Sequence, residues 1–259
     1  MGERKNGVSA TALKALQTLE IIAGSTAPLS VQDLAKKLNY DKATAYRMLL
    51  TLKSSGFVVR DEVTKRYNMS YKVVSLSRNL LAENEVTKLI LNALRELSAV
   101  TYETFHYSVL DGNQTVLVQR VKGNQLVNVD FQIGDRSPLH CTAIGKVVFA
   151  FQDIRFIEEI IAFGLSKMAS NTITDPDRLR LELNRIRSQG YAIDDHEFSD
   201  NMRCIAVPIF EGNGRVSGGI STSGPDSRFT FDKLEEFKKH ILKTSIDLSR
   251  QLGGMPWST

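Results

Sequence analysis

The clearest pattern of hydrophobic and polar positions lies between Ser30 and Gly56, where it predicts two short helices around a tight turn. Ser30, followed three residues later by Asp33, has the spacing of a capping box, and Asp41 is a good N-cap for the second helix. Apolar positions in the second helix recur at i, i+3, i+4 and i+7, which gathers on one face Ala45, Met48, Leu49 and Leu52. Gly56 can end that helix in a left-handed conformation. The stretch therefore predicts a helix-turn-helix.

The flanks of this helix pair complete a small domain. An i, i+3 row formed by Leu13, Leu16, Leu19 and Ile22 predicts a supporting helix over residues 12–23. Residues 57–60 and 66–69 predict two short strands of a hairpin with basic residues near its tip. Three helices and such a hairpin make a winged helix-turn-helix over residues 10–70, mainly α-helical. For the helix pair alone, a hairpin that only packs is the alternative.

The outward face of the second helix suits the major groove of DNA. It carries hydrogen-bond donors and methyl groups near a helix N-terminus, and such groups read base edges. We expect DNA contacts from that helix, from the helix before it and from the wing, at Ser30, Gln32, Lys42, Ala43, Thr44, Tyr46, Arg47, Lys65 and Arg66.

The positive charge of the chain is concentrated in the same region. Residues 1–70 contain 11 Lys and Arg against 6 Asp and Glu, a net charge of +5. The other 189 residues contain 22 against 23, a net charge of −1. Neutralising DNA phosphates requires cations where the duplex lies. The charge distribution therefore favours a DNA partner over a basic surface without one.

In the rest of the chain, the spacing of hydrophobic residues changes from the period of a helix to the alternation of a strand and back. Residues 71–84 predict a linker helix, and residues 86–99 a strongly amphipathic helix. Strands are expected over 105–110, 116–121, 127–133, 203–210 and 216–223, the first two joined at Asp111-Gly112. Helices are expected over 141–151, 153–163, 175–189 and 231–252. Residues 85–255 are thus predicted to form a GAF-like α+β domain with an antiparallel sheet, and residues 1–9 a flexible arm.

The composition of the chain bears on its cellular compartment and on the chemistry of its cysteines. The chain has 259 residues, of which 42% are hydrophobic and 24% charged, and it suits two modest domains. No apolar run approaches a membrane span, and no signal peptide opens the chain. Cys141 and Cys204 are too few for a disulfide framework and lie in no zinc-like spacing. We expect a cytoplasmic protein with no membrane association, no metal and no cofactor.

Several segments, in this order, resemble the isocitrate-lyase-regulator (IclR) family of bacterial transcriptional regulators. They are LSVQDLAKKL and DKATAYRMLLTLKSSGFV, then PLHCTAIGKV, TITDP, IRSQGYAIDDHEF, RCIAVPIF and ISTSGP. The resemblance covers about residues 12–252 and implies an N-terminal winged helix-turn-helix and a C-terminal effector-binding domain. It also implies dimers, which in this family often pair into tetramers, and effectors such as small organic, aromatic or sugar-derived acids. Asp41 stands where Pro or Ser is common, and Asn201 where Gly is common, near the expected pocket.

The resemblance places the effector among seven residues, Ala143, Ile144, Asp194, Met202, Cys204, Ser221 and Ser223. Residue chemistry points the same way. The helix expected to begin at Cys141 has small residues in its first turn, so its free N–H groups could approach an anion. Ser221 and Ser223 lie two apart on a strand and face one way. This lining suits a small carboxylate; a Gly- and Ser-rich strand without a ligand is the alternative.

Two features invite catalytic hypotheses. His140 and Cys141 could be a base and a nucleophile, but adjacent residues usually point apart and no third group orients the imidazole. A buried core cysteine is therefore favoured. Asp194, Asp195 and Glu197 could form an acid–base or metal cluster, for which a solvated acidic turn is the favoured interpretation. The four histidines have no metal-ligand spacing. We expect neither catalytic residues nor a metal site.

The sequence therefore predicts a DNA-binding transcriptional regulator and not an enzyme. A small organic-acid effector is expected to modulate its operator affinity or transcriptional output, in control of a catabolic operon. The expected assembly is a homodimer, or a dimer of dimers, on an inverted-repeat operator in double-stranded DNA. The alternatives are an enzyme with a Cys-based catalytic domain fused to a winged-helix module, and a winged helix that makes only protein contacts.

Overall fold

A computed structural model of the chain describes residues 8–81 and 85–256, which form two compact units divided between residues 82 and 83. Most of the predicted flexible arm (residues 1–7) and the end of the predicted linker helix (82–84) lie outside the described residues. None of the described helices is long and apolar enough to cross a membrane.

The first unit contains three helices, a two-stranded hairpin and a fourth helix. In chain order these are α1 (Ala10–Ala23), α2 (Val31–Leu38), α3 (Lys42–Ser54), β1 (Val58–Arg60), β2 (Tyr67–Met69) and α4 (Lys72–Leu81). Its core gathers Ile22, Leu29, Leu34, Leu49, Leu52, Val58 and Tyr67. The two strands pair antiparallel, and the segment before α2 joins them through Leu29, which bridges Tyr67. This is the predicted winged helix-turn-helix.

Local sequence explains where its helices begin and end. Ser30 and Asp33 form the predicted capping box of α2, and Asn39 ends α2 with φ 54°, in the left-handed region. Asp41 caps α3, and Gly56 follows α3 with φ 76°. The expected apolar row of α1 is wrong at its N-terminal half, because Leu13 and Leu16 are 46% and 56% exposed. Only the C-terminal half of α1 packs on the core.

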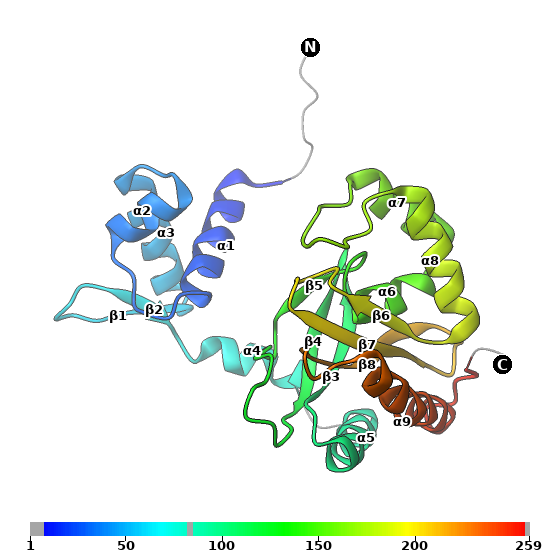
Figure 1. The fold of residues 1–259 in the computed structure, drawn as a ribbon. Coiled ribbons are helices and arrows are strands. Elements are labelled where there is room, and N and C mark those ends of the chain that lie inside the picture. The colour runs from blue at the N-terminus through cyan, green and yellow to red at the C-terminus, as the bar shows by residue number, and fades with distance from the viewer. Residues whose placement is uncertain (1–7, 82–84, 257–259) are drawn as a thin grey trace. The chain divides into compact units, whose positions relative to one another are not determined.

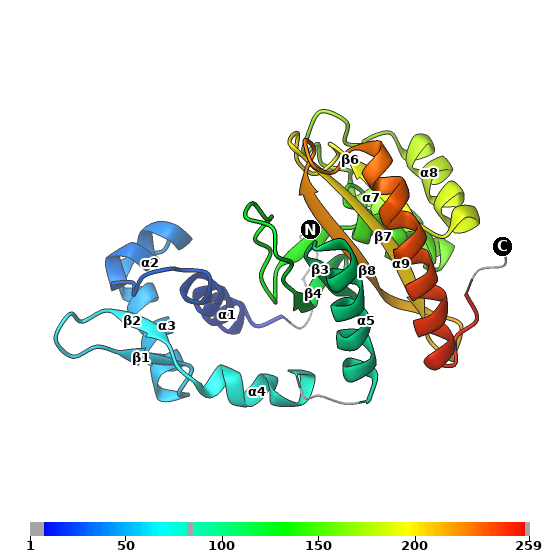
Figure 2. The same ribbon diagram turned by 60° about the horizontal axis from the view of Figure 1, so that its bottom comes forward.

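The second unit is a six-stranded antiparallel sheet between two layers of helices (Figures 1 and 2). Its helices are α5 (Glu85–Thr101), α6 (Ala143–Ala150), α7 (Ile154–Phe163), α8 (Pro176–Gln189) and α9 (Phe231–Gln251). Its strands are β3 (Phe105–Asp111), β4 (Gln114–Val121), β5 (Arg136–Pro138), β6 (Ala192–Asp195), β7 (Met202–Phe210) and β8 (Val216–Pro225), in the order β5-β4-β3-β8-β7-β6.

The two faces of this sheet have separate cores. Residues of α5 and α9 pack on one face with Phe105, Ile205 and Ile220. Residues of α6, α7 and α8 pack on the other face with Cys204 and Ala206. Because side chains alternate along each strand, the even-numbered positions of β7 all face α6. The predicted α+β architecture with an antiparallel sheet is confirmed.

Three strand predictions need correction. Residues 127–133 form no strand; the chain rejoins the sheet at β5, after Gly134 donates its N–H to the carbonyl oxygen of Leu117 at 2.8 Å. The loop between β3 and β4 is Gly112-Asn113, because Asp111 pairs with Gln114. Strand β6 was not predicted, since its sequence was interpreted as an acidic turn.

Candidate DNA interface and effector pocket

The recognition helix α3 separates an inner and an outer face as predicted. Asp41 accepts the N–H of Thr44 at 2.8 Å and so holds the start of the helix. The inner face is buried at Ala45, Met48, Leu49 and Leu52. The outer face exposes Lys42, Ala43, Tyr46 and Arg47. Asp41, which departs from the usual family residue, therefore starts α3 in the ordinary way.

The nine predicted DNA contacts differ in how free their side chains are. Gln32 and Lys65 are exposed, like the four residues on the outer face of α3. The hydroxyl of Ser30 donates to Asp33 at 2.8 Å and accepts the N–H of Asp33 at 3.2 Å. Thr44 is buried, and its hydroxyl donates to Asp41 at 2.7 Å. Ser30 and Thr44 thus use their hydroxyls to shape the helix ends, which leaves Arg47 as the exposed donor group on α3 with the longest reach.

The wing carries a carboxylate that the sequence analysis passed over. Glu62 lies 3.4 Å from Lys53, 3.6 Å from Arg60 and 3.4 Å from Lys65. Hydrogen bonds from Lys53 and Lys65 lower the pKa of Glu62. Arg66 turns away from the wing tip, because it donates to the carbonyl oxygen of Pro28 at 2.9 Å and pairs with Asp33 at 3.2 Å. Lys65 is therefore the basic residue of the wing turn, and its ammonium group is paired with Glu62.

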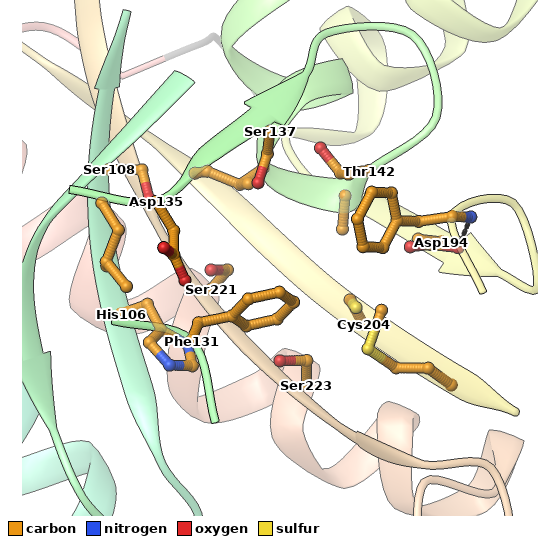
Figure 3. Close-up of a pocket in the computed structure, with 15 residues that line it drawn as sticks. His106, Ser108, Phe131, Asp135, Ser137, Thr142, Asp194, Cys204, Ser221 and Ser223 are labelled. Carbon is orange, nitrogen blue, oxygen red and sulfur yellow. Dashed lines mark hydrogen bonds between the residues drawn. The ribbon is translucent and has the colours of Figure 1, made fainter. Parts of the chain in front are cut away.

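A cavity in the second unit lies between the sheet and the start of α6. Its volume is about 40 Å³. All seven residues predicted for the effector site line it, and it is also lined by His106, Ser108, Phe131, Asp135, Ser137 and Phe198, among others. Strand pairing explains the convergence, since Asp194 lies opposite Cys204, Cys204 opposite Ser223, and Ser221 opposite His106. Figure 3 shows Ser221 and Ser223 between His106 at one end and Asp194 at the other.

Asp194 is a buried carboxylate, so the interpretation of this segment as a solvated acidic turn is wrong at Asp194. It lies in β6 and is fully buried. Its Oδ1 accepts the N–H groups of Glu197 at 2.8 Å and Phe198 at 3.3 Å. Its Oδ2 has no hydrogen-bond partner among the described residues, although the Cys204 thiol, a weak donor, is its neighbour. Burial raises the pKa of Asp194.

The ends of α6 and β6 are tied by a buried ion pair. Lys146 of α6 pairs with Glu197 and donates to the carbonyl oxygen of Ile193 at 2.7 Å. Burial raises the pKa of Glu197 to about 7. This pair joins two elements of the cavity wall, although neither Lys146 nor Glu197 lines the cavity.

The helix N-terminus beside the cavity begins two residues later than predicted. Thr142 is the N-cap of α6, and its hydroxyl accepts the N–H of Gly145 at 2.9 Å. The N–H groups of Ala143 and Ile144 make no hydrogen bond within the part of the chain that the structure describes. They remain as first-turn donors at the cavity wall. Asn201, the second family departure, is exposed and does not line the cavity.

His106 was not among the predicted site residues, because one histidine in a strand of alternating residues matches no sequence motif. It is 3% exposed, and its Nε2 has no partner within the described residues. Burial and, second, the charge of Arg120 lower the pKa of His106 to about 4. Its ring packs edge-on against Phe131, with centroids 5.8 Å apart. His106 is therefore neutral at physiological pH, with one donor and one acceptor nitrogen.

The two thiols lack the environment of a nucleophile. Burial raises the pKa of Cys141 to about 12 and the pKa of Cys204 well above its ordinary value. A reactive cysteine requires a thiolate, which both sites disfavour. The Nε2 of His140 lies 2.9 Å from the carbonyl oxygen of Ser166. Within the described residues, no cluster of His, Cys, Asp and Glu is arranged to hold a metal ion.

Comparison with known proteins covers both units. The model of the IclR helix-turn-helix domain matches residues 11–62, and that of the bacterial transcriptional regulator IclR C-terminal domain matches residues 78–250. The HTH-type transcriptional regulator KdgR of Dickeya chrysanthemi is 32% identical over 231 residues, which cover 89% of this chain and 76% of that protein. KdgR of Escherichia coli K12 is 31% identical, with 89% and 88% covered.

A solved structure agrees with these matches. The crystal structure of the Thermotoga maritima IclR superposes with a TM-score of 0.73 at 32% identity, covering 94% of this chain and 98% of that one. These relatives are transcriptional regulators and not enzymes. The chain therefore belongs to the IclR family of bacterial transcriptional regulators, and it is a DNA-binding regulator.

Proposed function

We propose that this regulator acts in the cytoplasm as a homodimer, or a dimer of dimers, on an inverted-repeat operator, and that a small organic acid bound in the cavity modulates its operator affinity or transcriptional output. The observation that carries the proposal is that one cavity is lined by all seven residues that the family resemblance places around the effector. Control of a catabolic operon would make such an acid a natural signal.

The groups around the cavity suit a carboxylate. The hydroxyl of Ser221 makes no hydrogen bond to any described residue, and the N–H groups of Ala143 and Ile144 are unpaired on the helix side. A carboxylate between them would accept hydrogen bonds from both walls and would meet the positive end of α6. Asp194 opposes an anion when ionised, and burial, which raises the pKa of Asp194, makes this carboxyl easier to protonate than a free one.

The size of the cavity favours an aliphatic acid over an aromatic one. Its volume is about 40 Å³. One water molecule needs at least about 10–15 Å³, whereas a cavity that holds benzene measures about 150 Å³. The cavity, which opens to solvent beside Asp135, therefore fits a chain of a few carbon atoms.

Calorimetric titration tests the site. Acetate, pyruvate, butyrate and benzoate would be titrated into the parent and into a variant carrying Ser221→Ala and Ser223→Ala. We expect the short aliphatic acids to bind and benzoate not to, with the double variant weaker by roughly 1–3 kcal/mol through lost hydrogen bonds to a charged group. Ser188→Ala, an exposed serine of α8, is the control. Equal affinities in parent and double variant would remove the serines from the site.

The same acids should change operator affinity, because a ligand that prefers one DNA-binding state shifts the equilibrium toward it. Fluorescence anisotropy on an operator obtained by in vitro selection would measure the shift. The double serine variant should bind that operator like the parent when no acid is present, since the substitutions lie in the other unit. A shift that persists in the double variant would place the effector elsewhere.

A further inference from the structure

The cavity has a second polar end that the family motifs do not include. It is formed by His106 and Ser108 of β3 and by Ser137 of β5. Figure 3 shows His106 and Ser108 on the opposite side of Ser221 from Asp194, and Ser137 above Ser221, nearer to Thr142. The groups proposed to bind the carboxylate of the effector belong to α6 and β8. This end of the cavity would therefore face the rest of the bound acid.

The polar groups of this end lack partners. Nε2 of His106 is buried without a hydrogen bond, and the hydroxyls of Ser108 and Ser137 make none to any residue that the structure describes. Buried polar atoms are nearly always paired in native proteins, so the unpaired Nε2 of His106 calls for a ligand atom or a water molecule. The hydroxyls of Ser108 and Ser137 are free to bind the same ligand atom. A ligand atom here must therefore form hydrogen bonds.

The charge at this end argues against a second carboxylate. Neither Lys nor Arg is among the described residues that line the cavity. Arg120, which lies opposite His106 on β4, is bound to Asp130 at 2.9 Å. Asp135, at the exposed edge of this end, adds a negative charge. The site therefore suits an uncharged polar group.

A hydroxyl satisfies these groups better than other small groups do. A neutral imidazole nitrogen is a donor in one tautomer and an acceptor in the other, and a hydroxyl can pair with either. Serine hydroxyls have the same dual character. A methyl group of the same size would leave all three unpaired, which costs binding energy.

Strand geometry sets how far this hydroxyl lies from the carboxylate. His106 is the register partner of Ser221 on the neighbouring strand. Adjacent strands are about 4.8 Å apart. The two subsites thus lie on neighbouring strands, and a short effector with about two carbon atoms between the carboxyl group and the hydroxyl oxygen is the length to test.

We propose that His106, with Ser108 and Ser137, forms a specificity subsite that recognises a hydroxyl at the far end of a short effector acid, so that the regulator prefers hydroxy acids to simple carboxylic acids of the same size. This inference rests on the proposed function, because it assumes that the carboxylate binds at Ser221 and α6. His106 is its central specificity-determining residue.

Two probes of equal shape test the subsite, 3-hydroxypropionate and butyrate, in which a hydroxyl replaces a methyl group. Both would be titrated into the full chain by calorimetry. We expect the parent to bind 3-hydroxypropionate at least tenfold more tightly than butyrate. His106→Phe should bring the two affinities within about twofold by weakening only the hydroxy acid, while His240→Phe on α9 should leave the tenfold preference in place.

The outcomes distinguish failure of the hydroxyl subsite at His106 from failure of the carboxylate site at Ser221 and α6. If neither acid binds, the proposed carboxylate site fails and the subsite with it. If both bind equally in the parent, the carboxylate site stands and the subsite is refuted, with water left as the partner of His106. If His106→Phe weakens both acids alike, His106 supports the cavity without reading the hydroxyl, and the subsite is again refuted. Ser108→Ala, a smaller change on the same strand, should reduce the preference in the same direction.

Discussion

Arg47 shows how a single outward side chain can define what the DNA-binding unit reads. Its guanidinium donates to the hydroxyl of Thr44 at 3.3 Å. That one bond leaves most of its five N–H donors free on an exposed helix face. The same contact through Thr44 to Asp41 orients the side chain near the N-terminal end of α3. Arginine in this position commonly pairs with both acceptors of a guanine.

We therefore expect Arg47→Ala to weaken binding to a selected operator by roughly 1–3 kcal/mol and to relax preference at one base pair. Lys65→Ala in the wing should instead weaken all duplexes about equally and lower the salt slope by about one. Anisotropy titrations with selected and scrambled duplexes at several salt concentrations would measure both. If the Arg47→Ala variant prefers the selected duplex over the scrambled duplex as strongly as the parent does, this face of α3 does not recognise the base sequence.

His106 also gives the second unit a defined response to acid. Its pKa in the folded protein is about 4, below its ordinary 6.5. Between these values the unfolded chain binds more protons, so stability falls as pH decreases from 6.5 to 4. The full effect amounts to about 3 kcal/mol. Glu197 acts in the opposite direction, since its pKa of about 7 exceeds its ordinary value of 4.5; its contribution is lost as pH rises from 4.5 to 7.

His106→Phe separates these two contributions, because Glu197 and the other carboxylates are common to both proteins. The difference in unfolding free energy between variant and parent should shift in favour of the variant as pH falls from 6.5 to 4. Urea unfolding followed by circular dichroism at half-unit pH steps would measure it. A difference that is constant over this range would mean that His106 is not held neutral.

At the scale of elements, the sequence predicted what local rules determine. The caps Ser30 and Asp41 and the apolar periodicity of α3 and α9 mark helices that the structure places within one or two residues of the prediction. Strand β6 was not predicted because it has only four residues, two of them aspartates, and such a segment has the composition of a turn. The seven effector residues came from family motifs, whereas His106 and Ser137 enter the cavity only through strand pairing across the sheet.

The turn before α6 is a further feature that depends on close backbone contact. A Cβ on Gly145 would lie 2.2 Å from the carbonyl oxygen of Pro138 and 2.8 Å from Cα of Leu139. Neither backbone atom can yield without moving β5 or the start of α6. We expect Gly145→Ala to destabilise the protein by roughly 1–3 kcal/mol and to weaken acid binding, because it displaces one wall of the cavity.

Differential scanning fluorimetry with and without pyruvate would measure both effects of Gly145→Ala. Gly212→Ala is the matched control, since its new Cβ would come no closer than 3.4 Å to any neighbour, the carbonyl oxygen of Leu252. A Gly145→Ala protein that melts and binds pyruvate like the parent would show that β5 and α6 can part without cost.

At the scale of the whole molecule, the two units differ in net charge, and the first unit exposes apolar side chains. The +5 charge of residues 1–70 attracts DNA, and the −1 charge of the remainder leaves the second unit without a general affinity for phosphate. A single winged helix makes few base contacts, so selective binding calls for two copies on one duplex. The exposed leucines of α1 and the exposed Val74 and Leu76 of α4 supply apolar surface for pairing two copies of the first unit.

A dimer would place two recognition helices about 34 Å apart, one turn of DNA, on an inverted repeat. Duplexes with half-sites spaced by about 10 base pairs should therefore bind far more tightly than duplexes with about 15, which put the second half-site on the opposite face. Leu13→Glu with Leu16→Glu should lower both self-association and operator affinity, because charge is costly in an apolar interface. Leu181→Glu, on the exposed face of α8, is the control. Sedimentation at micromolar concentration, free and on DNA, decides the matter: a parent protein that stays monomeric and binds both spacings equally would exclude the paired arrangement.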